Sequence, residues 1–115
     1  MQALLSALRR GRARKIAQLS TDLASIAGNQ SGGYYGYRAS KAALNMMTRS
    51  LAHELVPDGF TCLTLHPGWV QTDMGGPGAP LPVSESVAGM LRVIDRAGPD
   101  DSGKFLTRAG AELPW

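Results

Sequence analysis

The stretch Phe60-Thr-Cys-Leu-Thr-Leu65 decides the fold, because it is a short apolar run bounded on both sides by residues that break regular structure. Pro57-Asp58-Gly59 precedes it, and His66-Pro67-Gly68 follows it. The run is apolar on both faces of an extended chain, which is typical of a strand inside a parallel sheet. A run of this length between two turn signals also suits a strand better than a helix. The stretch therefore predicts a buried strand at 60–65.

Helical and extended segments alternate on either side of this strand. Helical spacing of apolar residues predicts helices over 2–10, 34–56 and 83–97, and short strands are expected at 15–20 and 104–107. The order helix, strand, helix, strand, helix, strand is typical of βαβ units with right-handed crossovers, so the fold class is α/β with a parallel sheet. In the long helix, the apolar stripe expected to face the core consists of Leu44, Met47, Leu51 and Leu55.

Composition places the chain among globular proteins and limits its partners. Of its 115 residues, 43% are hydrophobic and 18% are charged, which suits a single domain with a core. No apolar run approaches the ~20 residues of a membrane span, so we expect no membrane partner and a cytoplasmic protein. The single cysteine, Cys62, fits a reducing compartment and a role as buried core filler.

Basic residues gather near the N-terminus without predicting nucleic-acid binding. Five of them precede the first acidic residue, Asp22, in a chain of net charge +3: Arg9, Arg10, Arg12, Arg14 and Lys15. No aromatic residues lie among them for base stacking, so we expect a solvated helix end and no nucleic-acid partner. His53 and His66 have no cysteine or carboxylate at metal-ligand spacing, and we therefore expect no metal site.

The segment Tyr37-Arg-Ala-Ser-Lys41 carries the clearest chemical signal. Its phenol and its ammonium are four residues apart, so on a helix both lie on one face. A nearby positive charge favours the ionised form of a phenol, and such a tyrosine can exchange a proton with a carbonyl or hydroxyl oxygen. Tyr34 and Arg38 share the spacing, but an arginine stays charged and is hard to bury beside a ribose, so we expect no catalytic role for that pair.

Three segments together resemble the short-chain dehydrogenase/reductase family, in its C-factor and Sniffer-like carbonyl reductase subgroup. They are 25–45, with the sequence Ser-Ile-Ala-Gly-Asn-Gln-Ser-Gly-Gly-Tyr-Tyr-Gly-Tyr-Arg-Ala-Ser-Lys-Ala-Ala-Leu-Asn, 66–76, with His-Pro-Gly-Trp-Val-Gln-Thr-Asp-Met-Gly-Gly, and the closing 103–115. The resemblance implies a Rossmann-type doubly wound parallel sheet, of which this chain holds the C-terminal portion with about three strands and three helices.

The same resemblance assigns roles to individual residues. Tyr37 is the implied general acid in carbonyl reduction, and Lys41 is implied to lower the pKa of Tyr37 and to bind the nicotinamide ribose. The implied cofactor-binding positions are Tyr37 and Lys41 together with four residues in the segment after the strand at 60–65: Pro67, Gly68, Val70 and Thr72. The implied cofactor is NADP or NAD, with NADP favoured by the subgroup, and the implied partner is a small-molecule carbonyl substrate.

The family also places a serine hydroxyl at the end of the preceding strand. Counting from that strand end, the position falls on Thr21, where a threonine supplies the same hydroxyl with an added methyl group and a stiffer χ1. Ser20 is the alternative, although neighbouring strand residues point to opposite faces. Ser25 lies in the following loop and is the weaker candidate.

The glycine-rich dinucleotide fingerprint of the family does not occur in the chain. We therefore expect residues 1–115 to be the C-terminal half of a single Rossmann-type domain, without its N-terminal dinucleotide-binding half and inactive when isolated. Two functions stay open. One is an NAD(P)-dependent carbonyl reductase, of which this chain is a truncated piece. The other is a non-catalytic remnant that forms a homo- or hetero-dimer with a full-length relative through the helix at 34–56.

Overall fold

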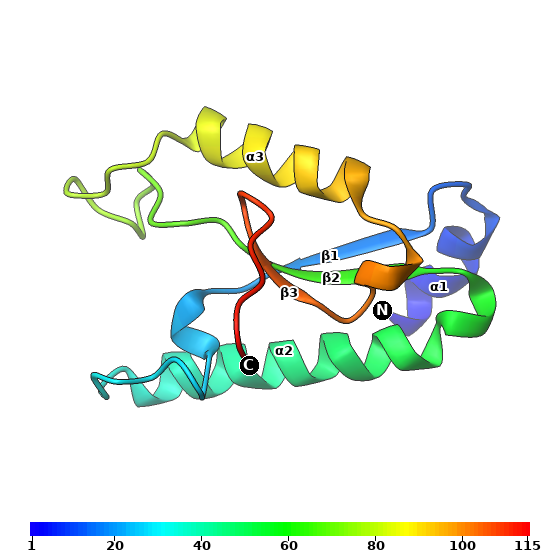
Figure 1. Ribbon diagram of the computed structural model, residues 1–115, viewed down its shortest axis with the longest axis horizontal. Helices are drawn as coiled ribbons and strands as arrows, with labels where there is room; N and C mark the ends of the chain where they lie inside the picture. The colour runs from blue at the N-terminus through cyan, green and yellow to red at the C-terminus, as the bar shows by residue number, and fades with distance from the viewer.

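A computed structural model describes all residues from 1 to 115. It shows a three-stranded parallel sheet with α2 on one face and α3 on the other, and α1 beside the end of the sheet (Figure 1). The elements follow the predicted order: α1 Gln2–Arg10, β1 Lys15–Leu19, α2 Tyr35–Glu54, β2 Thr61–His66, α3 Val83–Arg96 and β3 Phe105–Thr107. The prediction of an α/β fold with a parallel sheet is confirmed, and each boundary lies within two residues of the expected one.

The strand predicted at 60–65 is β2, the centre of the sheet. The order is β1-β2-β3, with Leu19 paired to Leu65 on one side and Phe105 paired to Thr64 on the other. Four consecutive residues of β2, 62–65, have no exposed surface. A strand with a hydrogen-bonded neighbour on each edge and a helix on each face leaves no face for water, which explains why it carries no polar–apolar alternation.

Alternate residues of β2 belong to two separate cores. The core under α3 contains Leu63, Leu65, Val93, Ala97 and Leu106. The core under α2 contains Ile16, Ala52, Leu55, Phe60 and Cys62. The expected burial of Cys62 is confirmed, and this burial raises the pKa of its thiol.

The predicted core stripe of α2 is wrong at one position. Met47 is 64% exposed, and Met46 beside it is 66% exposed. The helix instead turns Asn45, Thr48 and Ala52 toward the sheet, each at most 3% exposed. These smaller side chains lie on an i, i+3, i+7 stripe, and their size allows the helix backbone to approach the strands closely. Leu55 is buried as expected, while Leu44 and Leu51 are half-buried.

The basic residues near the N-terminus are less free than expected. Arg9 pairs with Asp58 at 2.8 Å, and the Arg14 guanidinium donates to the Asp58 carbonyl at 2.6 Å. Lys15 Nζ donates to the carbonyl of Ile94 at 2.7 Å. Three of the five residues therefore tie α1 and β1 to other parts of the chain. None of the helices is both long enough and apolar enough to cross a membrane.

Candidate active site

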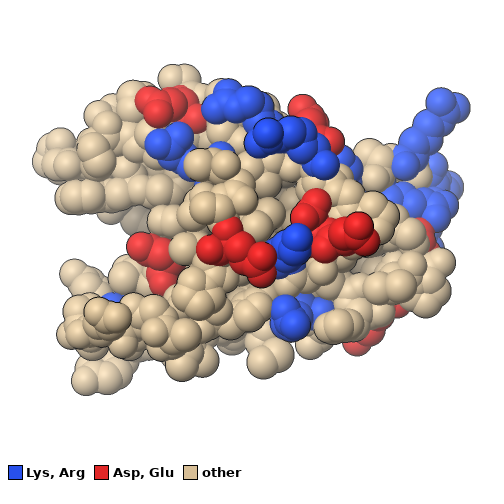
Figure 2. Space-filling model, viewed as in Figure 1, with Lys and Arg blue, Asp and Glu red and all other residues tan.

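The predicted site residues gather where the strands end at their carboxyl side. In open parallel sheets this edge is where ligands bind. Figure 2 shows an open notch there, between the loop that follows β2 and the segment that leads into α2, and the walls of the notch on this face are mostly uncharged. A hollow of about 590 Å³ lies in the loop beyond β2, lined by Gln71, Thr72, Asp73, Gly76 and Pro77.

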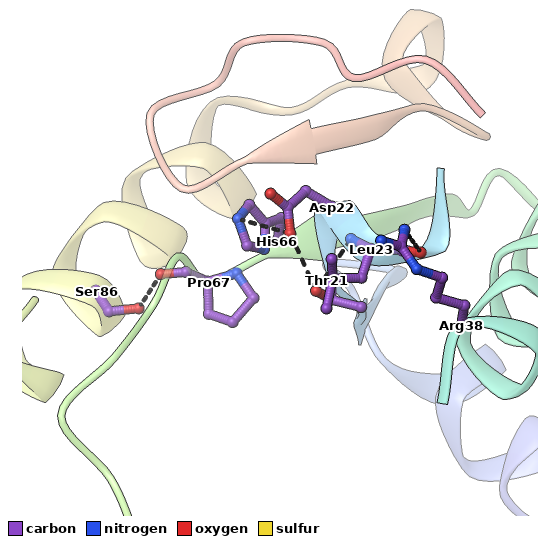
Figure 3. Close-up of polar contacts among 7 residues, drawn as sticks. All are labelled: Thr21, Asp22, Leu23, Arg38, His66, Pro67 and Ser86. Atoms are coloured by element: carbon purple, nitrogen blue, oxygen red, sulfur yellow. Dashed lines mark hydrogen bonds and ion pairs between the residues drawn. The ribbon is translucent and has the colours of Figure 1, made fainter. Parts of the chain in front are cut away.

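Thr21 caps a short 3₁₀ helix, Asp22–Ala24, directly after β1. The Thr21 backbone is extended, and the residue is 8% exposed. Its Oγ1 accepts a hydrogen bond from the Leu23 N–H at 3.2 Å and donates one to Asp22 Oδ1 at 3.2 Å (Figure 3). A threonine is well suited to this position, because its hydroxyl satisfies an N–H at the start of a helix that has no helical partner.

Ser20, the alternative to Thr21, is placed differently. Its Oγ is buried and has no hydrogen-bond partner in the chain. Successive residues of a strand point to opposite faces, and Ser20 lies on the same side of β1 as Ile16, which packs in the core under α2. A substrate at the edge of the sheet has no access to this atom, whereas Thr21 lies in the turn at that edge. Thr21 therefore stays the predicted hydroxyl of the site.

Tyr37 and Lys41 lie in the first two turns of α2, as their spacing predicted. Lys41 Nζ donates to the Leu19 carbonyl at 3.4 Å, which places the ammonium at the end of β1. Tyr37 lies one turn earlier on the same face, is 38% exposed, and makes no side-chain hydrogen bond within the chain. The helix and the end of β1 thus bring an ammonium, a free phenol and the Thr21 turn to one edge of the sheet.

Arg38 is a residue whose role the sequence did not reveal. Its guanidinium donates to the Leu23 carbonyl at 3.2 Å, and so joins α2 to the turn that Thr21 caps. It also binds the glycine-containing loop before α2, through the Gly33 carbonyl at 3.1 Å and the Ser31 hydroxyl at 3.1 Å. The five donors of an arginine beside a loop rich in free carbonyls were the available signal. Arg38 is therefore a structural clamp next to Tyr37.

The segment after β2 is held by α3 and by a glycine. The Ser86 hydroxyl of α3 donates to the Pro67 carbonyl at 2.7 Å, and Ser86 is 1% exposed (Figure 3). Gly68 has φ +89°, a conformation that favours glycine, and a Cβ there would lie 2.8 Å from Leu81 Cδ2. The Pro67–Gly68 turn is therefore tightly fixed against α3 and the segment that precedes it.

The remaining implied cofactor residues lie in a tight loop beyond this turn. Val70 forms an isolated bridge with Leu81, and its carbonyl accepts from the Thr72 N–H at 2.8 Å. Thr72 Oγ1 accepts from the Gly75 N–H at 3.1 Å. Trp69 is 60% exposed and donates through Nε1 to the Gly75 carbonyl at 2.7 Å. Its indole holds the loop together.

The polar groups left free in this region suit a nicotinamide nucleotide. The Val70 N–H has no partner in the chain, and Lys41 uses only one of its three N–H groups. An amide oxygen and ribose hydroxyls are the acceptors that such donors bind. Gly68 carries no side chain that would block close approach of a ring to the backbone. The donor set therefore fits the cofactor that the sequence implies.

Asp22 and His66 extend the site beyond the predicted residues. His66 Nε2 lies 3.8 Å from Asp22 Oδ1, the oxygen that also accepts from Thr21 (Figure 3). Burial lowers the pKa of His66, and the Asp22 charge partly opposes this by raising it. His66 Nδ1 is buried and has no partner in the chain. An aspartate directly after the strand-end hydroxyl, in a position to cap the same turn, was the only sign of this contact in the sequence.

The α/β fold and a Tyr–Lys pair beside a strand-end hydroxyl define a class of nicotinamide-dependent oxidoreductases. Residues 1–79 match the model of the short chain dehydrogenase family. The chain belongs to the short-chain dehydrogenase/reductase family of oxidoreductases.

Individual relatives agree with this membership. The chain is 54% identical over 113 residues to C-signal of Myxococcus xanthus, covering 98% of this chain and 68% of that protein. It is similar in structure to the carbonyl reductase Sniffer of D. melanogaster, with a TM-score of 0.94 and 40% identity. A similar likeness holds for an NADPH-bound carbonyl reductase from chicken fatty liver, with a TM-score of 0.91 and 38% identity. In both structural comparisons the match covers 99% of this chain but only 50% of the other chain.

Proposed function

We propose that this protein is an NAD(P)H-dependent carbonyl reductase that acts on a small-molecule carbonyl compound. The observation that carries the proposal is the placement of Lys41 at the end of β1, one helical turn from the unpartnered hydroxyl of Tyr37. The similarity to two carbonyl reductases, one of them NADPH-bound, supports this reaction and a nicotinamide cofactor. We favour NADP over NAD for the same reason.

The residues of this chain would hold the nicotinamide end of the cofactor, which supplies a hydride when bound. Lys41 would bind the ribose hydroxyls, and the Val70 N–H and Thr72 would bind the carboxamide. Pro67 and Gly68 would form the surface against the ring. The proposal extends to domain organisation: residues 1–115 form the C-terminal half of one Rossmann-type domain, and the pyrophosphate is bound by other residues. The coverage of half of each carbonyl reductase chain supports this view.

Tyr37 is the proposed proton donor to the substrate oxygen. A phenol that gives up its proton becomes an anion, and the Lys41 ammonium on the same helical face stabilises that anion. Thr21 is the proposed contact to the substrate oxygen. Arg38 and the hydrogen bond from Lys41 to the Leu19 carbonyl fix the start of α2 against the end of β1. The side chains of Tyr37, Lys41 and Thr21 therefore keep their relative positions during the reaction.

A second candidate function is association without catalysis. Met46 and Met47 are exposed on the face of α2 that points away from the sheet, and a full-length relative could cover them. In this case the chain would be a dimerisation partner. One measurement distinguishes the carbonyl reductase from the non-catalytic partner. Only the reductase oxidises the cofactor in a reaction that depends on Tyr37.

The test compares Tyr37→Phe with Lys41→Ala in this chain joined to the N-terminal half of the Sniffer carbonyl reductase. Binding of NADPH, followed by fluorescence, first establishes that the joined protein is assembled. We expect Tyr37→Phe to abolish carbonyl-dependent NADPH oxidation and to leave NADPH affinity nearly unchanged, because only the proton donor is lost. Lys41→Ala should reduce both activity and affinity. Activity of Tyr37→Phe above a few per cent of wild type would refute the proposed role.

A further inference from the structure

The Thr21 hydroxyl has little hydrogen-bonding capacity left in this structure. A hydroxyl has one proton and two lone pairs. Its proton is donated to Asp22 Oδ1 at 3.2 Å, and one lone pair accepts the Leu23 N–H at 3.2 Å (Figure 3). An ionised carboxylate has no proton to donate, so the direction of the bond between Thr21 and Asp22 is fixed. One lone pair of Thr21 is therefore the only group left for a ligand.

Several contacts keep the hydroxyl in this orientation. Thr21 is β-branched, which restricts its χ1, and it caps the 3₁₀ helix with an extended backbone. The Leu23 carbonyl is in turn held by Arg38 of α2 at 3.2 Å. Asp22 is approached from β2 by His66, whose side chain is 18% exposed and whose Nε2 lies 3.8 Å from the same Oδ1. The bond to Asp22 and the bond from the Leu23 N–H together orient the proton of Thr21 toward Asp22.

A carbonyl oxygen and an alcohol make opposite demands on this hydroxyl. A carbonyl oxygen needs a donor, which Thr21 supplies only by breaking its bond to Asp22. An alcohol carries its own proton and can donate it to the free lone pair of Thr21. The carbonyl form of a substrate therefore binds Thr21 only at the cost of the Thr21–Asp22 hydrogen bond, whereas the alcohol form binds without that cost.

We propose that Asp22 is a positioning residue that accepts a hydrogen bond from the Thr21 hydroxyl, so that the site binds the alcohol form of the substrate in preference to the carbonyl form. This inference rests on the proposed function, and it names the substrate form that the same site recognises better. The side chain of Asp22 is 59% exposed, so water competes for its oxygens and the preference is limited. One hydrogen bond of this kind corresponds to roughly a five- to tenfold change in affinity ratio.

The test measures the affinities of 1-phenylethanol and acetophenone for the NADP complex of the joined protein that carries Tyr37→Phe, in which neither probe reacts. Asp22→Ala frees the Thr21 proton, and we expect the ratio of alcohol affinity to ketone affinity to fall about five- to tenfold. Asp22→Ala made together with Thr21→Val is the matched control, because Asp22 then has no hydroxyl to orient and should not change the ratio. An unchanged ratio in Asp22→Ala, or an equal change in both backgrounds, would overturn the inference.

The outcomes also separate this inference from the proposed function. If the protein with Tyr37 intact reacts with both probes, and the ratio of alcohol affinity to ketone affinity is unchanged in Asp22→Ala, only the inference fails. If Tyr37→Phe retains carbonyl-dependent NADPH oxidation, the proposed function fails and the inference fails with it.

A second measurement needs neither cofactor nor substrate. Nuclear magnetic resonance titration of His66 in this chain should show a lower His66 pKa in Asp22→Asn, because the carboxylate charge that raises it is gone. Thr21→Val should raise the His66 pKa, because Asp22 Oδ1 then no longer binds the hydroxyl. A His66 pKa that falls in Asp22→Asn but does not change in Thr21→Val would show that Asp22 does not bind the Thr21 hydroxyl, and would overturn the inference independently of activity.

Discussion

Replacing Gly68 with alanine tests how tightly the turn at the end of β2 is fixed. Gly68 has φ +89°, and left-handed backbone costs a non-glycine residue about 1–2 kcal/mol. The new Cβ would also lie 2.8 Å from Leu81 Cδ2, against ~3.5–4.0 Å for an ordinary carbon–carbon contact. Leu81 is only 8% exposed and has little room to move, so overpacking adds about 1–3 kcal/mol. We expect Gly68→Ala to lower the free energy of unfolding by about 2–5 kcal/mol.

Gly76→Ala is the matched control, because it shares the backbone strain without the contact. Gly76 has φ +76°, and nothing lies within 4 Å of a Cβ built there. It should cost about 1–2 kcal/mol, so the difference between the two variants isolates the contact with Leu81. Urea unfolding followed by tryptophan fluorescence measures both free energies. Equal losses in the two variants would refute the claim that Leu81 closes the turn at Gly68.

Two further predictions concern the same edge of the sheet. Ser86→Ala leaves the Pro67 carbonyl without its donor at 2.7 Å and should lower the free energy of unfolding by about 1–3 kcal/mol in urea titrations, whereas Ser84→Ala on the exposed side of α3 should change it by less than about 0.5 kcal/mol. The lowered pKa of His66 means that the unfolded chain, whose histidine titrates near 6.5, binds a proton before the folded chain does. The stabilisation from neutral His66 is thus complete above pH 6.5 and is lost as the pH falls below it. His66→Asn should reduce this dependence of the free energy of unfolding on pH in urea titrations at several pH values, while His53→Gln at the exposed end of α2 should not.

The order of elements could be predicted because each signal was local. The apolar run at 60–65 lies between two turn signals, and a strand covered on both faces needs no other information to be recognised. The core stripe of α2 was predicted less well, because its side chains were ranked by hydrophobicity alone. Asn45 and Thr48 are buried and Met47 is exposed, which depends on how closely the helix backbone approaches the strands. That distance is set by tertiary packing and has no local signal in the sequence.

The candidate site, too, was predicted only where its residues give a local signal in the sequence. The spacing of Tyr37 and Lys41 was enough to place both on one face of α2, and the structure has them there. Asp22 and His66 are separated by 44 positions (66 − 22) and meet only because β1 and β2 are adjacent and parallel. A register between strands has to be known before such a contact can be predicted.

The candidate site is held in place by side chains that bind backbone carbonyls at the ends of the strands. Lys41 of α2 binds the Leu19 carbonyl at the end of β1, and Ser86 of α3 binds the Pro67 carbonyl just after β2. Because α2 and α3 lie on opposite faces of the sheet, each helix fixes one of the two adjoining strand ends (Figure 1). The position of the Thr21 turn relative to the Pro67 turn therefore depends on both packing layers. A change in either core can shift one half of the site against the other without touching a residue that contacts the ligand.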